Sequence, residues 1–174
     1  DETKLLELIE ETMNQNKQCC EIKLTQNKVV LVDKEDYEYL NQWKWYACKR
    51  GRTDDYYARR IKYENGEKII INMAREIMGL KNKKLQVDHI NHNSLDNRKN
   101  NLRICTQAEN QWNRNGFKNS KTGIKGVHML KGRYVAEIYV NKKYYYLGWF
   151  KTKKEASNVY KNAAIKYHGQ FARF

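Results

Sequence analysis

The sequence of 174 residues has few of the features that mark secreted, membrane-spanning or zinc-finger proteins. Its four cysteines form no C-x-x-C pair, and the adjacent Cys19 and Cys20 are badly placed to close a useful disulfide. No apolar run reaches the length of a membrane span, and no signal peptide is recognisable. We therefore expect a soluble protein with reduced thiols in a cytosol-like compartment.

Acidic residues are also scarce. The chain has 20 Asp and Glu against 34 Lys and Arg, a formal net charge of +14 and a sequence pI near 9.6. Such an excess favours a polyanionic partner, above all a nucleic acid. The 13 tyrosines point the same way, because many alternate with Lys and Arg as in sheets that face phosphates and sugars. A merely soluble basic protein is the alternative that charge alone leaves open.

Hydrophobic residues make up 40% of the chain and charged residues 31%, which favours several small units with modest cores. We expect an α+β, multi-module fold. Apolar residues at helical spacing predict an N-terminal amphipathic helix within residues 1–20. Residues 21–80 are predicted to form a small β-rich, DNA-contacting domain with short helices after Asp33 and over 73–80. Its strands are expected, from period-two patterns, near residues 22–24, 29–32, 43–49, 56–62 and 68–72.

Residues 81–115 are the predicted catalytic core. A strand ends at Asp88, a polar loop covers 90–101, a second strand covers 102–105, and a helix begins at Thr106. Thr106 and Glu109 are spaced as a capping box, which marks the start of this helix well. Asn110 then lies one turn into the helix, where its side chain can point back towards the end of the strand that bears Asp88.

The rest of the chain predicts a basic linker over residues 116–123 and a second small domain over 124–174. Three antiparallel strands are expected near 126–130, 133–141 and 144–150, followed by a helix that starts with a capping box at Thr152 and ends at Gly169. One face of the middle strand should pack on this helix through Tyr134, Ala136, Ile138 and Val140. The helix should contribute Ala156, Val159, Tyr160, Ala163, Ala164 and Tyr167.

Four polar residues carry the predicted chemistry. Asp88 and His89 are adjacent, Asn101 ends the polar loop, and Asn110 lies in the predicted helix. Asp88 and Asn110 offer hard oxygen donors suited to one divalent ion, Mg²⁺ or Mn²⁺. His89 is placed to take a proton from water as a general base. Asn101 could accept a hydrogen bond from the other ring nitrogen of His89 and so fix its tautomer.

These residues lie in segments that resemble a known signature. Val87-Asp88-His89-Ile90-Asn91, Asn100-Asn101-Leu102-Arg103 and Glu109-Asn110 are similar to the motif of H-N-H nucleases of the ββα-metal class. The similarity is to the variant with Asn in place of the last His, as in phage and intron-encoded homing endonucleases. It implies metal ligation by Asp88 and Asn110, a general base in His89, and orientation of that base by Asn101.

The same resemblance implies a site-specific endonuclease that hydrolyses phosphodiesters of double-stranded DNA with one divalent metal ion and no small-molecule cofactor. Residues 21–80 are similar to the β-rich N-terminal segment of the phage enzymes. Met73-Ala74-Arg75 stands where these enzymes often have Met-His-Arg. We expect a monomer, with a dimer as the alternative, in the cytoplasm of the host of a phage or mobile element.

The C-terminal segment resembles the plant ethylene-response-factor (apetala-two type) DNA-binding domain. The similarity rests on Lys125-Gly126-Val127, Ala136-Glu137-Ile138, Tyr146-Leu147-Gly148-Trp149-Phe150 and Glu155-Ala156. It implies DNA binding through the sheet. Over the whole chain, the predicted DNA contacts are Arg59, Arg60, Arg98, Lys99, Arg114, Lys118, Lys121, Lys125, His128, Lys131, Arg133, Glu137, Tyr139, Tyr144 and Tyr146.

Two alternatives remain open at this point. A regulator that only binds DNA would explain the C-terminal domain, although it gives no reason for Asp88, His89 and Asn110. A structural zinc site could use Asp88, His89 and His92, although cysteine ligands at finger spacing are missing.

Overall fold

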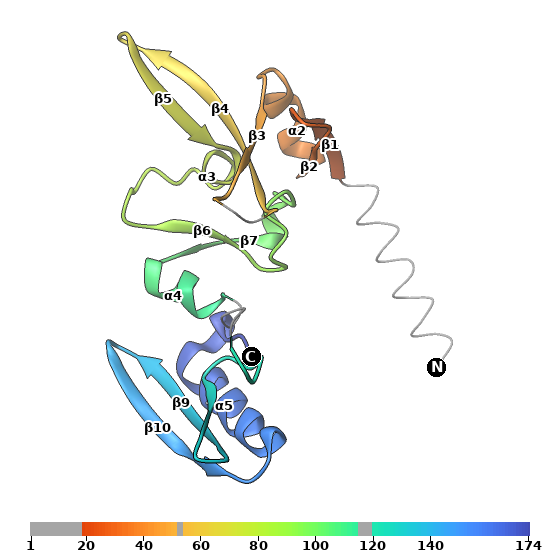
Figure 1. The fold of residues 1–174 in the computed structure, drawn as a ribbon. Coiled ribbons are helices and arrows are strands. Elements are labelled where there is room, and N and C mark those ends of the chain that lie inside the picture. Colours follow the sequence, from red (N-terminus) through yellow and green to blue (C-terminus); the bar gives the residue numbers. More distant parts are fainter. Residues whose placement is uncertain (1–18, 52–53, 115–119) are drawn as a thin grey trace, which may run out of the picture. The chain divides into compact units, whose positions relative to one another are not determined.

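The computed structural model describes residues 19–51, 54–114 and 120–174 (Figure 1). The helix expected within residues 1–20 and the first half of the expected linker, with Lys118, lie outside the described residues. The chain divides into two compact units, the first ending at Cys105 and the second running from Thr106 to Phe174. The boundary expected after residue 80 therefore lies inside the first unit.

The described residues form a mixed α and β structure with several small antiparallel sheets, as the α+β prediction requires. The described part of the first unit starts with a hairpin that turns at Gln26 and Asn27, both at positive φ. A short helix and a three-stranded sheet of order β3-β4-β5 follow. These elements are β1 (Cys19–Lys23), β2 (Val29–Asp33), α2 (Lys34–Asn41), β3 (Tyr46–Lys49), β4 (Tyr56–Glu64), β5 (Glu67–Asn72) and α3 (Met73–Ile77).

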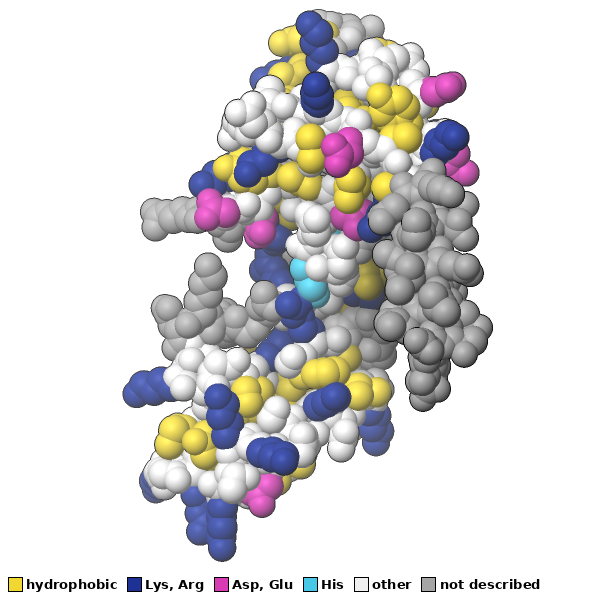
Figure 2. Space-filling model, turned by 90° about the vertical axis from the view of Figure 1, so that its right-hand side faces the viewer, with side chains coloured by type: hydrophobic (Ala, Val, Ile, Leu, Met, Phe, Trp, Pro, Cys, Tyr) yellow, Lys and Arg dark blue, Asp and Glu magenta, His cyan; other side chains and the backbone are white. Residues whose placement is uncertain are grey.

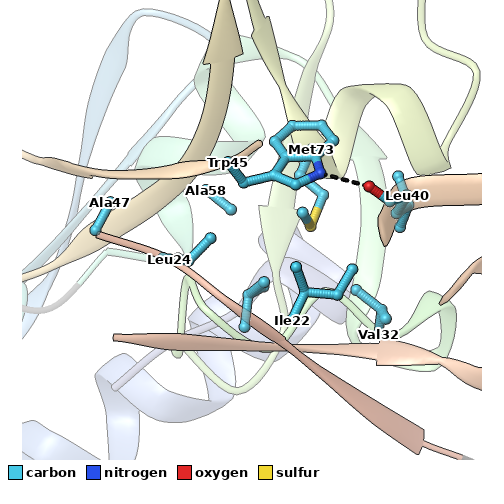
Figure 3. Packing of buried hydrophobic residues seen from close by; sticks show 9 residues of the cluster. Ile22, Leu24, Val32, Leu40, Trp45, Ala47, Ala58 and Met73 are labelled. Atoms are coloured by element: carbon cyan, nitrogen blue, oxygen red, sulfur yellow. Dashed lines mark hydrogen bonds between the residues drawn. The ribbon is translucent and has the colours of Figure 1, made fainter. Parts of the chain in front are cut away.

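A hydrophobic core joins the hairpin, α2 and the sheet (Figure 3). It contains Ile22, Leu24, Val30, Val32, Leu40, Trp45, Ala47, Ala58 and Met73. The indole N–H of Trp45 donates to the Leu40 carbonyl at 2.8 Å, so its one polar group is satisfied inside the core. The strand expected over 43–49 begins only at Tyr46.

The first unit ends with a two-stranded sheet formed by β6 (Gln86–His89) and β7 (Leu102–Cys105), which pair antiparallel. A polar loop connects them and closes with the 3₁₀ turn η1 (Lys99–Asn101). Asp88 lies opposite Arg103, and His89, the last residue of β6, lies opposite Leu102. The second strand over 102–105 is confirmed, whereas the first strand ends at His89, one residue later than expected.

The second unit combines a capped helix with a three-stranded sheet of order β10-β9-β8 and a long helix. Both expected capping boxes, at Thr106 and Thr152, are present. The elements are α4 (Gln107–Trp112), β8 (Val127–Leu130), β9 (Arg133–Val140), β10 (Lys143–Phe150), α5 (Lys153–His168) and η2 (Gly169–Phe171).

One face of β9 packs on α5 as predicted, through Ala136, Ile138 and Val140 with Tyr134 at its margin. The helix face differs at its end, because Tyr167 is 41% exposed and His168 is buried instead. His168 follows Ala164 by one helical turn, and its ring contacts the Tyr139 carbonyl through Nε2 at 3.2 Å. No helix in the described part of the chain is long and apolar enough to cross a membrane.

Candidate active site

Asp88 is held at the end of β6 by an ion pair with the residue opposite it on β7. Nε and Nη2 of Arg103 donate to Oδ2 of Asp88 at 2.9 and 2.7 Å. The Asp88 side chain is 8% exposed, so the carboxylate is largely out of water. A buried carboxylate needs such a partner, and the sheet register supplies it.

His89 is equally buried and contacts a residue that sequence reasoning did not single out. Its Nε2–H donates to Oδ1 of Asn97 at 2.7 Å, and Asn97 is 1% exposed. Burial lowers the pKa of His89, while the Asn97 hydrogen bond and the charges of Asp88 and Asp96 oppose this shift. A neutral ring that carries its hydrogen on Nε2 has its basic lone pair on Nδ1.

Asn101 ties the loop between β6 and β7 rather than the ring of His89. Its Oδ1 accepts from the Asn91 amide at 2.9 Å, and its Nδ2 donates to the Asp96 carbonyl at 2.7 Å. The hydrogen bond that His89 was expected to donate to Asn101 is thus made to Asn97 instead. The side-chain oxygen and nitrogen of Asn101 both bond to the backbone of the loop, so Asn101 positions this loop.

Arg98 and Lys99, two expected DNA contacts, are held in ion pairs within the first unit. Nε and Nη2 of Arg98 donate to Asp96, both at 2.8 Å. Burial alone would favour the protonated acid, but Arg98 and Asn91 hold the pKa of Asp96 below its ordinary value. The Lys99 ammonium lies 3.1 Å from Asp36 and also contacts Glu35.

The two neighbouring arginines of β4 have different surroundings. Arg60 is 7% exposed and forms an ion pair with Glu76 at 2.7 Å. The guanidinium of this expected DNA contact is therefore bound to a carboxylate inside the protein. Arg59 is half-buried, and its guanidinium lies 5.8 Å from the centre of the Tyr57 ring. That ring centre lies 6.4 Å from the ring centre of His89. Arg59 and His89 therefore both lie near the Tyr57 ring.

Asn110 lies on α4, in the second unit, and is half-buried. Its partnership with Asp88 in one metal site therefore stays a prediction. Carboxylate and carboxamide oxygens suit Mg²⁺ or Mn²⁺ in kind, because Mg²⁺ is usually held by one or two carboxylates with water and substrate phosphate as further ligands. Among residues 19–51, 54–114 and 120–174, no three His, Cys, Asp or Glu side chains gather as a metal-binding group. Asp88, His89 and His92, the residues of the zinc alternative, do not form such a group in the described part of the chain.

Lys125, an expected DNA contact of the second unit, caps the C-terminal end of α4. Its ammonium donates to the carbonyls of Gln111, Trp112 and Arg114, which end α4. Burial, with a smaller effect of the Arg173 charge, lowers its pKa to about 8. Lys125 also lines a pocket of about 810 Å³ together with Glu137, Tyr139 and Tyr144.

The remaining expected contacts of the second unit lie on its surface. Tyr139 lies opposite Tyr144, with ring centres 4.6 Å apart, and Glu137 lies opposite Tyr146. Exposed residues of this set are Arg114, Lys121, His128, Lys131, Arg133, Tyr139, Tyr144 and Tyr146. Figure 2 shows that Lys and Arg outnumber acidic side chains on the face that it presents.

Sequence reasoning missed Asn97, Arg103 and Glu76. Asn97 follows His89 by eight residues in an Asn-rich loop, where carboxamides ordinarily form turns. Arg103 was visible as part of a motif, but only the pairing of β6 with β7 reveals its bond to Asp88.

Comparison with known proteins bears on the same segment. Residues 75–112 match the family model described as HNH endonuclease. The chain is also 26% identical, over 141 residues, to a protein of Acanthamoeba polyphaga mimivirus described as an uncharacterized HNH endonuclease. That similarity covers 81% of this chain and 71% of the viral protein. Residues 75–112 are therefore similar to HNH endonuclease domains, and this segment includes Asp88, His89, Asn101 and Asn110.

Proposed function

We propose that this protein is a site-specific, divalent-metal-dependent DNA endonuclease of the homing type, with His89 as its general base. One observation carries the proposal. Asp88 and His89 stand side by side, both 7% exposed, at the end of β6 inside the segment that matches HNH endonucleases.

In this mechanism Nδ1 of His89 takes the proton of a water molecule as the water oxygen attacks phosphorus and the bond to the 3′ oxygen breaks. A positioned general base contributes about 10²–10⁴-fold. Asp88 and Asn110 would hold the metal ion, which when bound supplies positive charge to the phosphate and assists the departing oxygen. Arg103 holds the Asp88 carboxylate, and Asn101 keeps the intervening loop closed.

The proposed substrate is double-stranded DNA, bound along much of the chain. Residues 106–174 contain 14 Lys and Arg and 3 Glu, so most of the net charge of the protein belongs to the second unit. We assign DNA contact there to the exposed residues of the linker and sheet, in an ethylene-response-factor-like arrangement. Arg59, which like His89 lies near the Tyr57 ring, is the proposed contact of the first unit. One such site per chain predicts nicking by a monomer, whereas a double-strand break requires a dimer or sequential turnover.

The decisive test is plasmid cleavage by the His89→Ala variant. Supercoiled DNA is incubated with Mg²⁺ and either wild type or variant, and nicked circles are measured over time. We expect the variant to lose about 10²-fold or more of the rate, because the proton acceptor is gone, while its DNA affinity in a gel-shift assay stays the same. Equal nicking by both proteins at contaminant level would contradict the enzyme and favour a regulator that only binds DNA.

A further inference from the structure

Asn97 is the most completely buried polar side chain beside the candidate base. It is 1% exposed, and its Oδ1 lies 2.7 Å from Nε2 of His89. A carboxamide oxygen can only accept a hydrogen bond, so the contact requires the hydrogen of the neutral imidazole to be on Nε2. The basic lone pair is then confined to Nδ1, and the ring cannot turn over without losing the bond.

Asn97 is itself held by the N-terminal hairpin. The main-chain N–H of Asn97 donates to the Leu31 carbonyl at 2.8 Å, and the main-chain N–H of Leu31 donates to the Leu95 carbonyl, also at 2.8 Å. Leu31 thus directs both main-chain polar groups to residues 95–97, which form a parallel bridge with β2. In the β1–β2 ladder Leu31 lies opposite Glu21. Because the N–H and C=O groups of Leu31 both bond to residues 95–97, Leu31 and Glu21 form a non-hydrogen-bonded pair of this antiparallel ladder.

The anchor is rigid, because the neighbours of Leu31 on β2 belong to the core. Val30 and Val32 are both 0% exposed. Two further bonds hold the loop on either side of Asn97. Ser94 Oγ donates to the Tyr56 carbonyl at 2.7 Å, and the Lys99 amide donates to Oδ2 of Asp33 at 2.7 Å.

We propose that Asn97 is a positioning residue that sets the tautomer and orientation of His89, and that strand β2 holds Asn97 in place for this purpose. The proposal rests on the proposed role of His89 as general base. The β-rich N-terminal segment, predicted to contact DNA, is on this account also part of the catalytic machinery.

The first test replaces Asn97 with Leu, which has a similar shape and no acceptor, in the full chain. The matched control is Asn93→Leu, because Asn93 is an exposed residue of the same loop that caps the Leu95 amide at 3.1 Å. With ¹⁵N-labelled histidine, wild type and control should show an Nε2–H signal of His89 that exchanges slowly with water. The signal is assigned by its loss in His89→Ala. We expect Asn97→Leu to lose it.

The same variants are compared in cleavage. Asn97→Leu should cut about 10–100-fold more slowly at saturating DNA, as expected for loss of a bond that orients an imidazole, with unchanged DNA affinity. In the His89→Ala background it should have no further effect on residual cleavage, because Asn97 acts through His89. A folded Asn97→Leu protein that keeps the signal or cuts at the wild-type rate, while His89→Ala is inactive, would overturn the inference. Failure of the proposed function looks different, since wild type and His89→Ala would then cut equally.

Hydrogen exchange of wild type tests the role of β2. We expect the Asn97 amide to be protected to the same degree as the amides of Val30 and Val32, because a loop bonded to β2 opens only when the hairpin does. Fast exchange at Asn97 beside slow exchange at Val32 would contradict the anchoring.

Discussion

Gly126 has a residue-level requirement that its position in the second unit explains. Its φ is +68°, and a Cβ there would overlap the ring of Tyr160 and lie 2.5 Å from the Glu137 carbonyl oxygen. Tyr160 is 2% exposed and part of the core between the sheet and α5, so its ring cannot move aside easily. Gly126→Ala should therefore destabilise the second unit by about 1–3 kcal/mol through overpacking, beyond the strain of the backbone. Urea denaturation measures the loss.

Gly132 provides the matched control. Its φ is +75°, in the β8–β9 turn, and a Cβ there would meet nothing within 4 Å. Gly132→Ala carries the same kind of backbone strain without the overlap. Equal losses of stability in the two variants would show that the left-handed backbone, and not the approach to Tyr160, explains the glycine.

At the same scale, the candidate site was only partly predictable. Asp88 and His89 could be placed at a strand end because period-two patterning stops there. Arg103 and Asn97 act through side-chain contacts that depend on the sheet register and on the fold of a polar loop. Local sequence carries no signal for either contact. Charge was a poor guide for the same reason, since Arg60 and Lys99 are paired with acids that lie far away in the sequence.

At the scale of elements, prediction was most successful where local chemistry decides. Both capping boxes were found because their residues satisfy neighbouring backbone groups. The helix expected over 73–80 was too long, because it ends at Ile77 and Gly79 has a φ of +57°. Arg75 then donates to the carbonyls of Leu80, Asn82 and Leu85, so the following segment is held in a non-helical path.

Lys125 shows how a side chain from another segment ends a helix. Its pKa of about 8 in the folded protein lies below the ordinary value of 10.5, because burial disfavours the charge. Between these values the unfolded chain binds more protons than the folded one, so the contribution of Lys125 to stability rises with pH. Wild type should therefore gain stability relative to Lys125→Met between pH 7.5 and 9.5. Urea midpoints at the two pH values measure this.

Lys121→Met is the control for the previous comparison, since Lys121 is an exposed lysine of the same segment. It should show the same pH dependence as wild type. Parallel pH dependences in wild type and Lys125→Met would mean that the three carbonyls at the end of α4 hold the ammonium charged throughout.

At the scale of the whole molecule, the excess of positive charge should appear in the salt dependence of DNA binding. Each phosphate that a protein neutralises on B-DNA steepens the fall of log K with log salt by about 0.9. Lys131 and Arg133 are exposed at the β8–β9 turn and on β9, where they are proposed contacts. The double variant Lys131→Gln with Arg133→Gln should make the slope shallower by about 1–2 units on a non-specific duplex.

Lys99 separates charge that contacts DNA from charge that is used inside the protein. Glu35 and Asp36 bind its ammonium and raise its pKa, so it has acidic partners before any phosphate approaches. Lys99→Gln removes a formal charge but should leave the slope of wild type nearly unchanged. Titrations of the three proteins between 50 and 200 mM salt decide the point. If Lys99→Gln flattens the slope as much as a substitution at the β8–β9 turn, net charge alone governs binding and the assignment of contacts to the sheet of the second unit is wrong.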